Sequence, residues 1–162
     1  MNLPPYPIYP RIQDKKVTLR KVLNEDLPQL VEISYYDAVQ ATSVEQSAEM
    51  QKKIDQDYFD GKSIHWLIEN IGTKEIVGTC GFYRGFSKGQ GELGCILLPK
   101  FQGYGYMTSA MTLAINFGTN EMGLKRIWAA TRKDNNKAIN LLKRLDFSIF
   151  KYSNQEIEFE IK

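Results

Sequence analysis

The sequence has few residues of the kinds that build disulfide frameworks and metal sites. It contains two cysteines, Cys80 and Cys95, and one histidine, His65, among 162 residues. A disulfide-stabilised protein would use more cysteines, and a metal centre would need a cluster of ligands. A catalytic cysteine would need a histidine partner, and nothing in the sequence brings His65 near either thiol. We therefore interpret both cysteines as buried free thiols and expect no metal.

Long apolar runs and blocks of one charge are also missing. No stretch of about 18 apolar residues occurs, so we expect no membrane-spanning helix and no membrane partner. The formal net charge is only +2, and basic residues are interleaved with acidic ones, which argues against a nucleic-acid partner. The first ten residues include four prolines and lack the basic start and apolar core of a signal peptide. We therefore expect a cytoplasmic protein.

The composition that remains is that of one folded domain. Hydrophobic residues make up 43% of the chain, and its length suits a single domain with a two-layer core. No internal repeat, charge block or low-complexity run divides the sequence. The prolines predict an extended N-terminal arm over residues 1–15, followed by a single domain over residues 16–162.

Apolar periodicity predicts the elements of this domain. Residues 17–22 alternate as a strand does, and in the last strand Ile157, Phe159 and Ile161 alternate with glutamates. Helical spacing predicts four helices. The first is capped by Asn24 or Asp26 and includes Tyr35 and Tyr36, the second begins near Ser43 or Ser47, the third near residue 107, and the fourth at Asn135 or Asn136. The further strands are expected at residues 64–70, 75–82, 91–98 and 124–131 and just after Phe147. A meander combined with one strand–helix–strand unit predicts an α+β class with a mixed sheet.

The clearest chemical signal is the junction between the strand at 91–98 and the next helix. Pro99 ends the strand, and Gln102-Gly103-Tyr104-Gly105-Tyr106-Met107 leads into the helix. Such a junction offers free N–H groups, the positive end of a helix dipole and glycines that admit a phosphate. A Walker loop is excluded because no Gly-Lys-Ser/Thr follows, and a dinucleotide fingerprint because Thr108 replaces the third glycine. By itself the loop fits either a pyrophosphate site or a tight turn without a ligand.

The same segment matches the Gln/Arg-x-x-Gly-x-Gly/Ala pattern of the GNAT superfamily of N-acetyltransferases, with Met107 in place of the usual final small residue. The branch of ribosomal-protein N-acetyltransferases (RimJ/RimL-like), which the chain resembles, often carries Gly-x-Gly-Tyr-Ala/Met here. Further matches occur in the family's order over residues 16–152. They are residues 18–27 for the first strand and helix start, 91–99 for the fourth strand, 121–127 for the approach to the fifth, and 135–147 for the Asn-x-x-Ser/Ala helix, with Asp146 replacing a glycine.

The resemblance implies an α+β fold with a mixed, mostly antiparallel central sheet of about seven strands and about four flanking helices. The fourth and fifth strands would splay apart and hold the pantetheine arm of acetyl-coenzyme A, the implied co-substrate. Lys143 fits a solvated helix face equally well. The implied cofactor-binding residues are Ile96, Leu97, Leu98, Gln102, Gly103, Tyr104, Gly105, Tyr106, Met107, Thr108, Asn135, Asn140 and Lys143.

The expected chemistry begins with a neutral amine, whose pKa of about 8 to 10 calls for a general base. Glu92, on the strand before the loop, is the best carboxylate for a base or base relay, and its rival role is structural or substrate-orienting. A backbone N–H near Ile96 or Leu97 would stabilise the oxyanion. The family's usual acids, a tyrosine or a serine, are replaced by Leu142 and Ala138, which leaves Tyr152 or water.

Two functional hypotheses follow. The first is an N-acetyltransferase that moves an acetyl group from acetyl-coenzyme A to a primary amine, a protein N-terminus or a small molecule, by direct attack in a ternary complex. The second is a sensor or scaffold that binds the cofactor with little catalysis. A homodimer is also expected, because the alternating final strand could pair with another chain.

Overall fold

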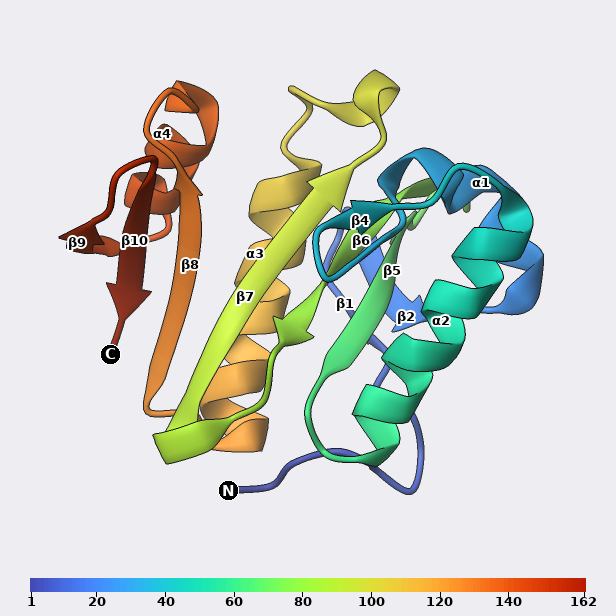
Figure 1. Ribbon diagram of the computed structural model, residues 1–162, viewed down its shortest axis with the longest axis horizontal. Coiled ribbons are helices and arrows are strands. Elements are labelled where there is room, and N and C mark those ends of the chain that lie inside the picture. The colour runs from blue at the N-terminus through green and yellow to red at the C-terminus, as the bar shows by residue number, and fades with distance from the viewer.

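The computed structural model describes residues 1–162. At its centre lies a sheet of eight strands in the order β1-β2-β5-β6-β7-β8-β10-β9 (Figure 1). Every neighbouring pair is antiparallel except β7 and β8, so the predicted mixed, mostly antiparallel sheet is confirmed. The strands are β1 (Ile12–Gln13), β2 (Val17–Lys21), β5 (Ile64–Asn70), β6 (Ile76–Tyr83), β7 (Gln90–Leu97), β8 (Arg126–Arg132), β9 (Ser148–Tyr152) and β10 (Glu156–Ile161).

Four α-helices flank the sheet, as predicted: α1 (Leu27–Leu30), α2 (Val44–Phe59), α3 (Tyr106–Phe117) and α4 (Asn136–Arg144). α2 begins at Ser43, whose side chain accepts a hydrogen bond from the N–H of Gln46 and so caps the helix. In Figure 1, α3 lies behind β7, while α1 and α2 lie on the other side of the molecule. None of these helices combines the length and apolar character needed to span a bilayer.

Alternation along the strands divides the core into two layers. In β5, Trp66 and Ile68 belong to the larger cluster, which contains the α3 residue Ala114, whereas Leu67 belongs to a smaller cluster with Leu27 of α1. Successive strand residues point to opposite faces, so one strand supplies both layers. α3 therefore packs on one face of the sheet, and α1 with α2 on the other.

The first helix is shorter than predicted. α1 ends at Leu30, and the predicted helical pair Tyr35–Tyr36 instead forms β3, which pairs with β4 (Val39–Gln40). The turn between them, Asp37–Ala38, has φ of 48° and 64° at its two residues, as a two-residue type I′ hairpin requires. The helical prediction for Tyr35 and Tyr36 was wrong because aromatic pairs also favour strands, and helical spacing alone does not mark the end of a short helix.

The predicted splay of the two central strands is confirmed. β7 pairs with β8 only at Gln90↔Arg126, Gly91↔Ile127 and Glu92↔Trp128. From Leu93 onward β7 has no partner on that side. Figure 1 shows the two strands diverging toward the end at which β7 leads through its loop into α3 and β8 leads into α4.

The N-terminal arm lies across the edge and base of the domain. Its β1 adds the eighth strand by pairing with β2. The indole N–H of Trp66 donates to the carbonyl of Pro10 at 3.0 Å, and the hydroxyl of Tyr9 donates to the carbonyl of His65. The arm is thereby hydrogen-bonded to β5.

The final strand is not an edge of the sheet. β10 lies between β8 and β9, so the interpretation that it could pair with another chain was wrong. The open edge is β9, all of whose residues are exposed, among them Phe150 and Tyr152. Apolar and charged residues alternate along β10 because the two faces of the strand differ in burial. An interior strand can show this alternation as well as an edge strand.

Candidate functional site

The loop before α3 presents a row of unpaired N–H groups. Gly103 and Gly105 have φ of 85° and 82°, in the left-handed region that favours glycine, and Gly105 is the N-cap of α3. No backbone N–H from Gly103 through Thr108 donates a hydrogen bond within the protein. Gln102 through Gly105 are exposed. Because the positive end of the helix dipole lies here as well, the loop is suited to an anion.

A lysine that the sequence analysis did not single out holds this loop from the side. The ammonium of Lys16, just before β2, donates to the carbonyl of Tyr104 and lies 5.1 Å from the centre of the Tyr106 ring. The hydroxyl of Tyr106 accepts a hydrogen bond from the side chain of Asn70 at 2.7 Å. The ends of β2 and β5 thus brace the loop. No sequence motif marks Lys16, because its partner lies far along the chain.

Beyond Glu92, β7 and β8 leave a gap between them. The hydrogen-bonding direction of each β7 residue decides whose backbone groups face this gap. The N–H of Leu98 donates to the carbonyl of Val77 at 2.9 Å, and Ile96 lies opposite Thr79. In an antiparallel pair, successive residues direct their backbone groups alternately to one neighbouring strand and to the other. Ile96 therefore directs its N–H and C=O to β6, whereas Leu97 and Cys95 direct theirs toward β8. Of the three strand residues predicted to bind the cofactor, only Leu97 faces the gap. Cys95 was missed, because the register of β6 against β7 decides which residues face the gap.

Glu92 lies at the closed end of the gap, since it is the last residue of β7 paired with β8. One carboxylate oxygen forms an ion pair with Arg84, and the other is buried without a partner. The hydrogen bond that Arg84 donates to this carboxylate raises the pKa of Arg84. Glu92 lies opposite Tyr83, so its side chain is on the α1–α2 face of the sheet.

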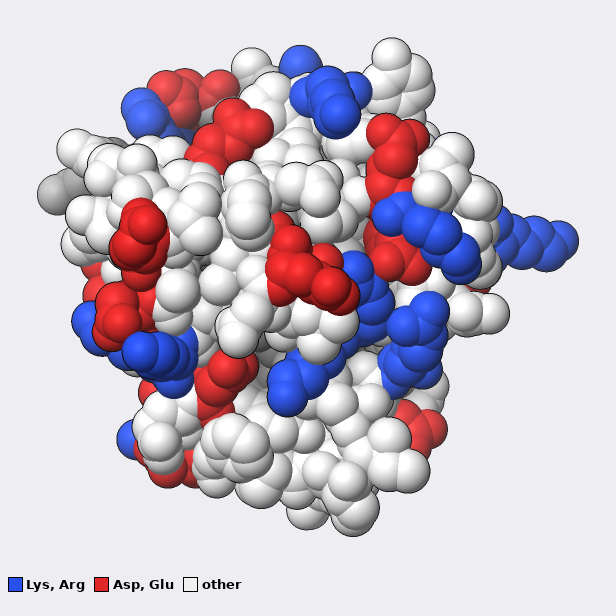
Figure 2. Space-filling model, turned by 90° about the vertical axis from the view of Figure 1, so that its right-hand side faces the viewer, with Lys and Arg blue, Asp and Glu red and all other residues white.

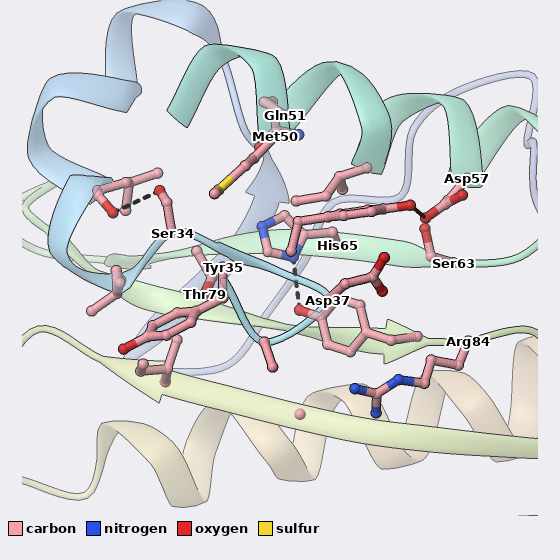
Figure 3. Close-up of a pocket in the computed structure, with 18 of the residues that line it drawn as sticks. Ser34, Tyr35, Asp37, Met50, Gln51, Asp57, Ser63, His65, Thr79 and Arg84 are labelled. Atoms are coloured by element: carbon pink, nitrogen blue, oxygen red, sulfur yellow. Dashed lines mark hydrogen bonds between the residues drawn. The ribbon is translucent and has the colours of Figure 1, made fainter. Parts of the chain in front are cut away.

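A cavity of about 700 Å³ opens on this same face (Figure 3). Its walls are α1, α2, the β3–β4 hairpin and strands β5, β6 and β7. Met50 and Ile54 of α2 line the cavity. Its volume is in the range of small-molecule sites.

Two uncharged titratable groups form the floor of the cavity. Nδ1 of His65 lies 2.7 Å from the hydroxyl of Tyr83. Burial lowers the pKa of His65 to about 4 and raises the pKa of Tyr83 well above its usual value. The Tyr83 ring lies against Gly94, where an added Cβ would stand 3.0 Å from the ring. His65 was predicted to lie on a strand without a role, and the structure brings it into the cavity.

Replacing His65 with glutamine is expected to reduce the loss of folding stability at acidic pH. Wild-type stability is complete above the unfolded pKa of about 6.5 and falls as the pH approaches the folded pKa of about 4, because the unfolded state binds a proton that the folded state does not. The full difference between the folded and unfolded pKa values corresponds to about 3 kcal/mol of folding free energy. Urea unfolding at about pH 7 and about pH 4.5 measures it. His65 is the only histidine, so equal losses in both proteins would contradict the assignment.

α4 presents the remaining predicted residues on the other side of the gap. The side chain of Asn135 accepts a hydrogen bond from the N–H of Ala138 at 3.1 Å and caps the helix. Asn140 and Lys143 lie on its exposed face. Leu142 is buried in the core, so this helix offers no acid there. Tyr152 lies on β9, separated from β7 by two strands, and is not brought to the site.

The two cysteines lie directly opposite each other on β6 and β7, both with free thiols. A hydrogen bond with Cys80, together with burial, raises the pKa of Cys95 well above its usual value. Cys95 is therefore not a ready thiolate nucleophile. No group of three or more His, Cys, Asp or Glu side chains is arranged to hold a metal ion.

Comparison with known proteins agrees with this geometry. The sequence model of the acetyltransferase (GNAT) domain matches residues 16–148. The N-acetyltransferase YoaA of Bacillus subtilis, itself uncharacterized, is 26% identical over 148 residues, which are 86% of this chain and 84% of that protein. Spermidine N(1)-acetyltransferase of Escherichia coli K12 is 31% identical over 81 residues, 50% of this chain and 41% of that protein.

The fold likeness extends over nearly the whole chain. A Vibrio cholerae structure assigned as a ribosomal-protein-serine acetyltransferase superposes with a TM-score of 0.78 at 18% identity, over 93% of this chain and 96% of that one. This likeness shows a shared fold. GNAT acetyltransferases use acetyl-coenzyme A as co-substrate. The domain match covers most of the chain, and the splayed strands and the glycine-containing loop agree with it. The chain therefore belongs to the GNAT acetyltransferase family and is an acyltransferase.

Proposed function

We propose that the protein transfers the acetyl group of acetyl-coenzyme A to a primary amine by direct attack in a ternary complex. The observation that carries this proposal is the row of unpaired N–H groups from Gly103 through Thr108, placed where β7 and β8 diverge. The pyrophosphate accepts hydrogen bonds from these N–H groups. Tyr104, Tyr106 and Met107 contribute their backbone N–H groups to this row, and Gln102 begins the loop. The pantetheine arm pairs with Leu97 and Cys95 in the gap.

The rest of the cofactor lies against α4. Asn135, whose amide nitrogen has no partner within the protein, binds the pantetheine end, and Asn140 and Lys143 bind the adenosine phosphates from the exposed face of the helix. A lysine suits a phosphate as a point charge. Ile96 and Leu98 contribute side chains to the wall of the site rather than free N–H groups.

The acceptor amine enters from the cavity on the α1–α2 face. Glu92, at the closed end of the gap, takes its proton directly or through water, and an N–H directed into the gap, from Cys95 or Leu97, stabilises the oxyanion. The leaving thiolate, with a pKa of about 8.5, takes its proton from water. No tyrosine on α4 is needed for that step.

Two measurements test the proposal. Calorimetry with coenzyme A should detect binding, and thiol release in the presence of acetyl-coenzyme A and a panel of amines and peptides should detect turnover. Absence of binding would overturn the proposal. Tight binding without turnover on any acceptor would instead favour a sensor or scaffold.

Replacing Lys16 with methionine is expected to weaken coenzyme A binding about tenfold. The change removes the hydrogen bond that holds the Tyr104 carbonyl and a positive charge beside the loop, and it keeps the apolar stem. The matched control is Lys15→Met, because Lys15 is an exposed neighbour with no hydrogen bond or ion pair. Calorimetry with coenzyme A compares the variants. Equal affinities would show that Lys16 has no part in the phosphate site.

The homodimer expected from the sequence is proposed at β9 rather than at the final strand. β9 is the open edge of the sheet, and its apolar side chains Ile149, Phe150 and Tyr152 are exposed. Pairing of two such edges around a twofold axis would continue the sheet through both copies. Sedimentation velocity measures the oligomeric state.

A further inference from the structure

The cavity on the α1–α2 face has two chemically different ends. Ile96 lies opposite Thr79, and Glu92, whose partner Arg84 lines the cavity, lies opposite Tyr83. The two pairs are four residues apart along β7, a distance of about 13 Å. In Figure 3, Asp57 and Arg84 lie toward one side, and Ser34 and Met50 toward the other. Leu30 and Ile33 pack in one apolar cluster with Ile96, and Figure 3 places Met50 toward the same end.

Three polar side chains at the apolar end already have hydrogen-bond partners. The hydroxyl of Ser34 donates to the carbonyl of Leu30 at 2.8 Å and lies 2.8 Å from the hydroxyl of Ser47. The side-chain amide of Gln51 donates to Asp55 at 3.0 Å. No carboxylate at this end faces the cavity. An ammonium placed here would lose its hydration without gaining a counter-charge, whereas an apolar group would gain by burial.

The charged end is balanced rather than anionic. Its lining includes two carboxylates, Asp37 and Asp57, and two cations, Lys62 and Arg84. Asp57 accepts the Tyr36 hydroxyl at 2.8 Å. Figure 2, which views the molecule from the side of α1 and α2, shows acidic and basic side chains interspersed rather than gathered by sign. A polycation would find no row of free carboxylates here.

The β3–β4 hairpin limits the size of the acceptor. Tyr35, Tyr36, Asp37 and Ala38 all line the cavity, so the hairpin closes one side of it. The space that remains suits a compact molecule better than a polypeptide chain.

We infer, on the basis of the proposed function, that the acceptor is a small monoamine with an apolar body, of the alkylamine or arylalkylamine class. Its amine lies near Gly94 and Tyr83, beside the gap that holds the thioester. Its carbon body lies among Met50, Ile54 and Ile96. This acceptor differs from spermidine, whose several ammonium groups the apolar end would have to accept.

A matched pair of amines tests the inference. Heptylamine and 1,6-diaminohexane have the same chain length and differ only in a terminal methyl group against an ammonium. We expect kcat/KM for heptylamine to exceed that for the diamine by at least about tenfold, since burying an unpaired ammonium is unfavourable. Equal or higher values for the diamine or for spermidine would overturn the inference and leave the proposed function standing.

Two variants at Met50 sharpen the test. Met50→Glu places a carboxylate at the apolar end and is expected to reverse the preference toward 1,6-diaminohexane. Met50→Gln has the same size without the charge and is expected to lower turnover of both amines without reversal. An unchanged ratio in Met50→Glu, with the fold intact by circular dichroism, would show that the amine's body lies elsewhere.

Two further outcomes also decide the matter. A peptide with a free N-terminus that exceeds every small amine by tenfold would overturn the inference. If no acceptor is turned over, the proposed function fails separately, and calorimetry of heptylamine against 1,6-diaminohexane with the coenzyme A complex still shows which amine the cavity prefers.

Discussion

Replacing Gly105 with aspartate is expected to weaken coenzyme A binding by at least about 100-fold. At φ of 82° any side chain is strained, and an added Cβ would stand 3.3 Å from the ammonium of Lys16. The new carboxylate would draw Lys16 away from the Tyr104 carbonyl and add negative charge where the pyrophosphate binds. Calorimetry with coenzyme A measures the loss.

The matched control is Gly105→Asn. Asparagine has nearly the same shape as aspartate, tolerates the left-handed region and carries no charge. We expect it to lose about tenfold in affinity, through bulk alone. If aspartate and asparagine weakened binding equally, the loop would not be recognising an anion. Thermal unfolding of both variants checks that the fold is retained.

Replacing Glu92 with glutamine is expected to lower kcat about 100-fold while the affinity for coenzyme A stays unchanged, because the change removes a base and leaves the loop untouched. The deficit should shrink toward about pH 10, where the amine loses its proton without help. Initial rates across this pH range measure it. Rates that fall equally at every pH would argue against a role in proton removal.

Arg84→Gln separates catalysis from structure. It removes the ion-pair partner of Glu92 but keeps the carboxylate, so the rate should fall far less than in Glu92→Gln. If Glu92 were only structural, both variants would lose stability to urea alike, with kcat per folded molecule preserved.

Features that depend on neighbouring residues in the chain were predictable from the sequence. Apolar runs bounded by turn residues located β5, β6 and β7 to within about a residue. The glycines of the loop lie at positive φ because the chain must turn sharply into α3. Asn135 begins the last helix because its side chain caps it. The splay of β7 from β8 was predicted only through the family resemblance.

Features that depend on contacts between distant segments were not predictable. Lys16 and Tyr104 are 88 residues apart, and no local pattern relates them. The cavity floor arises because His65 and Tyr83, on different strands, meet across the sheet. The identity of the residues facing the gap required the register of β6 against β7, which a single sequence does not supply.

The contact of Tyr83 with Gly94 has a consequence for how this family varies during evolution. The ring occupies the space that a side chain at position 94 would need, because an added Cβ there would stand 3.0 Å from the ring. Substitutions at positions 83 and 94 are therefore coupled. A homologue that gains a side chain at 94 must reduce or reorient the aromatic group at 83, and the lineage that does so acquires a differently shaped floor and a different range of acceptors.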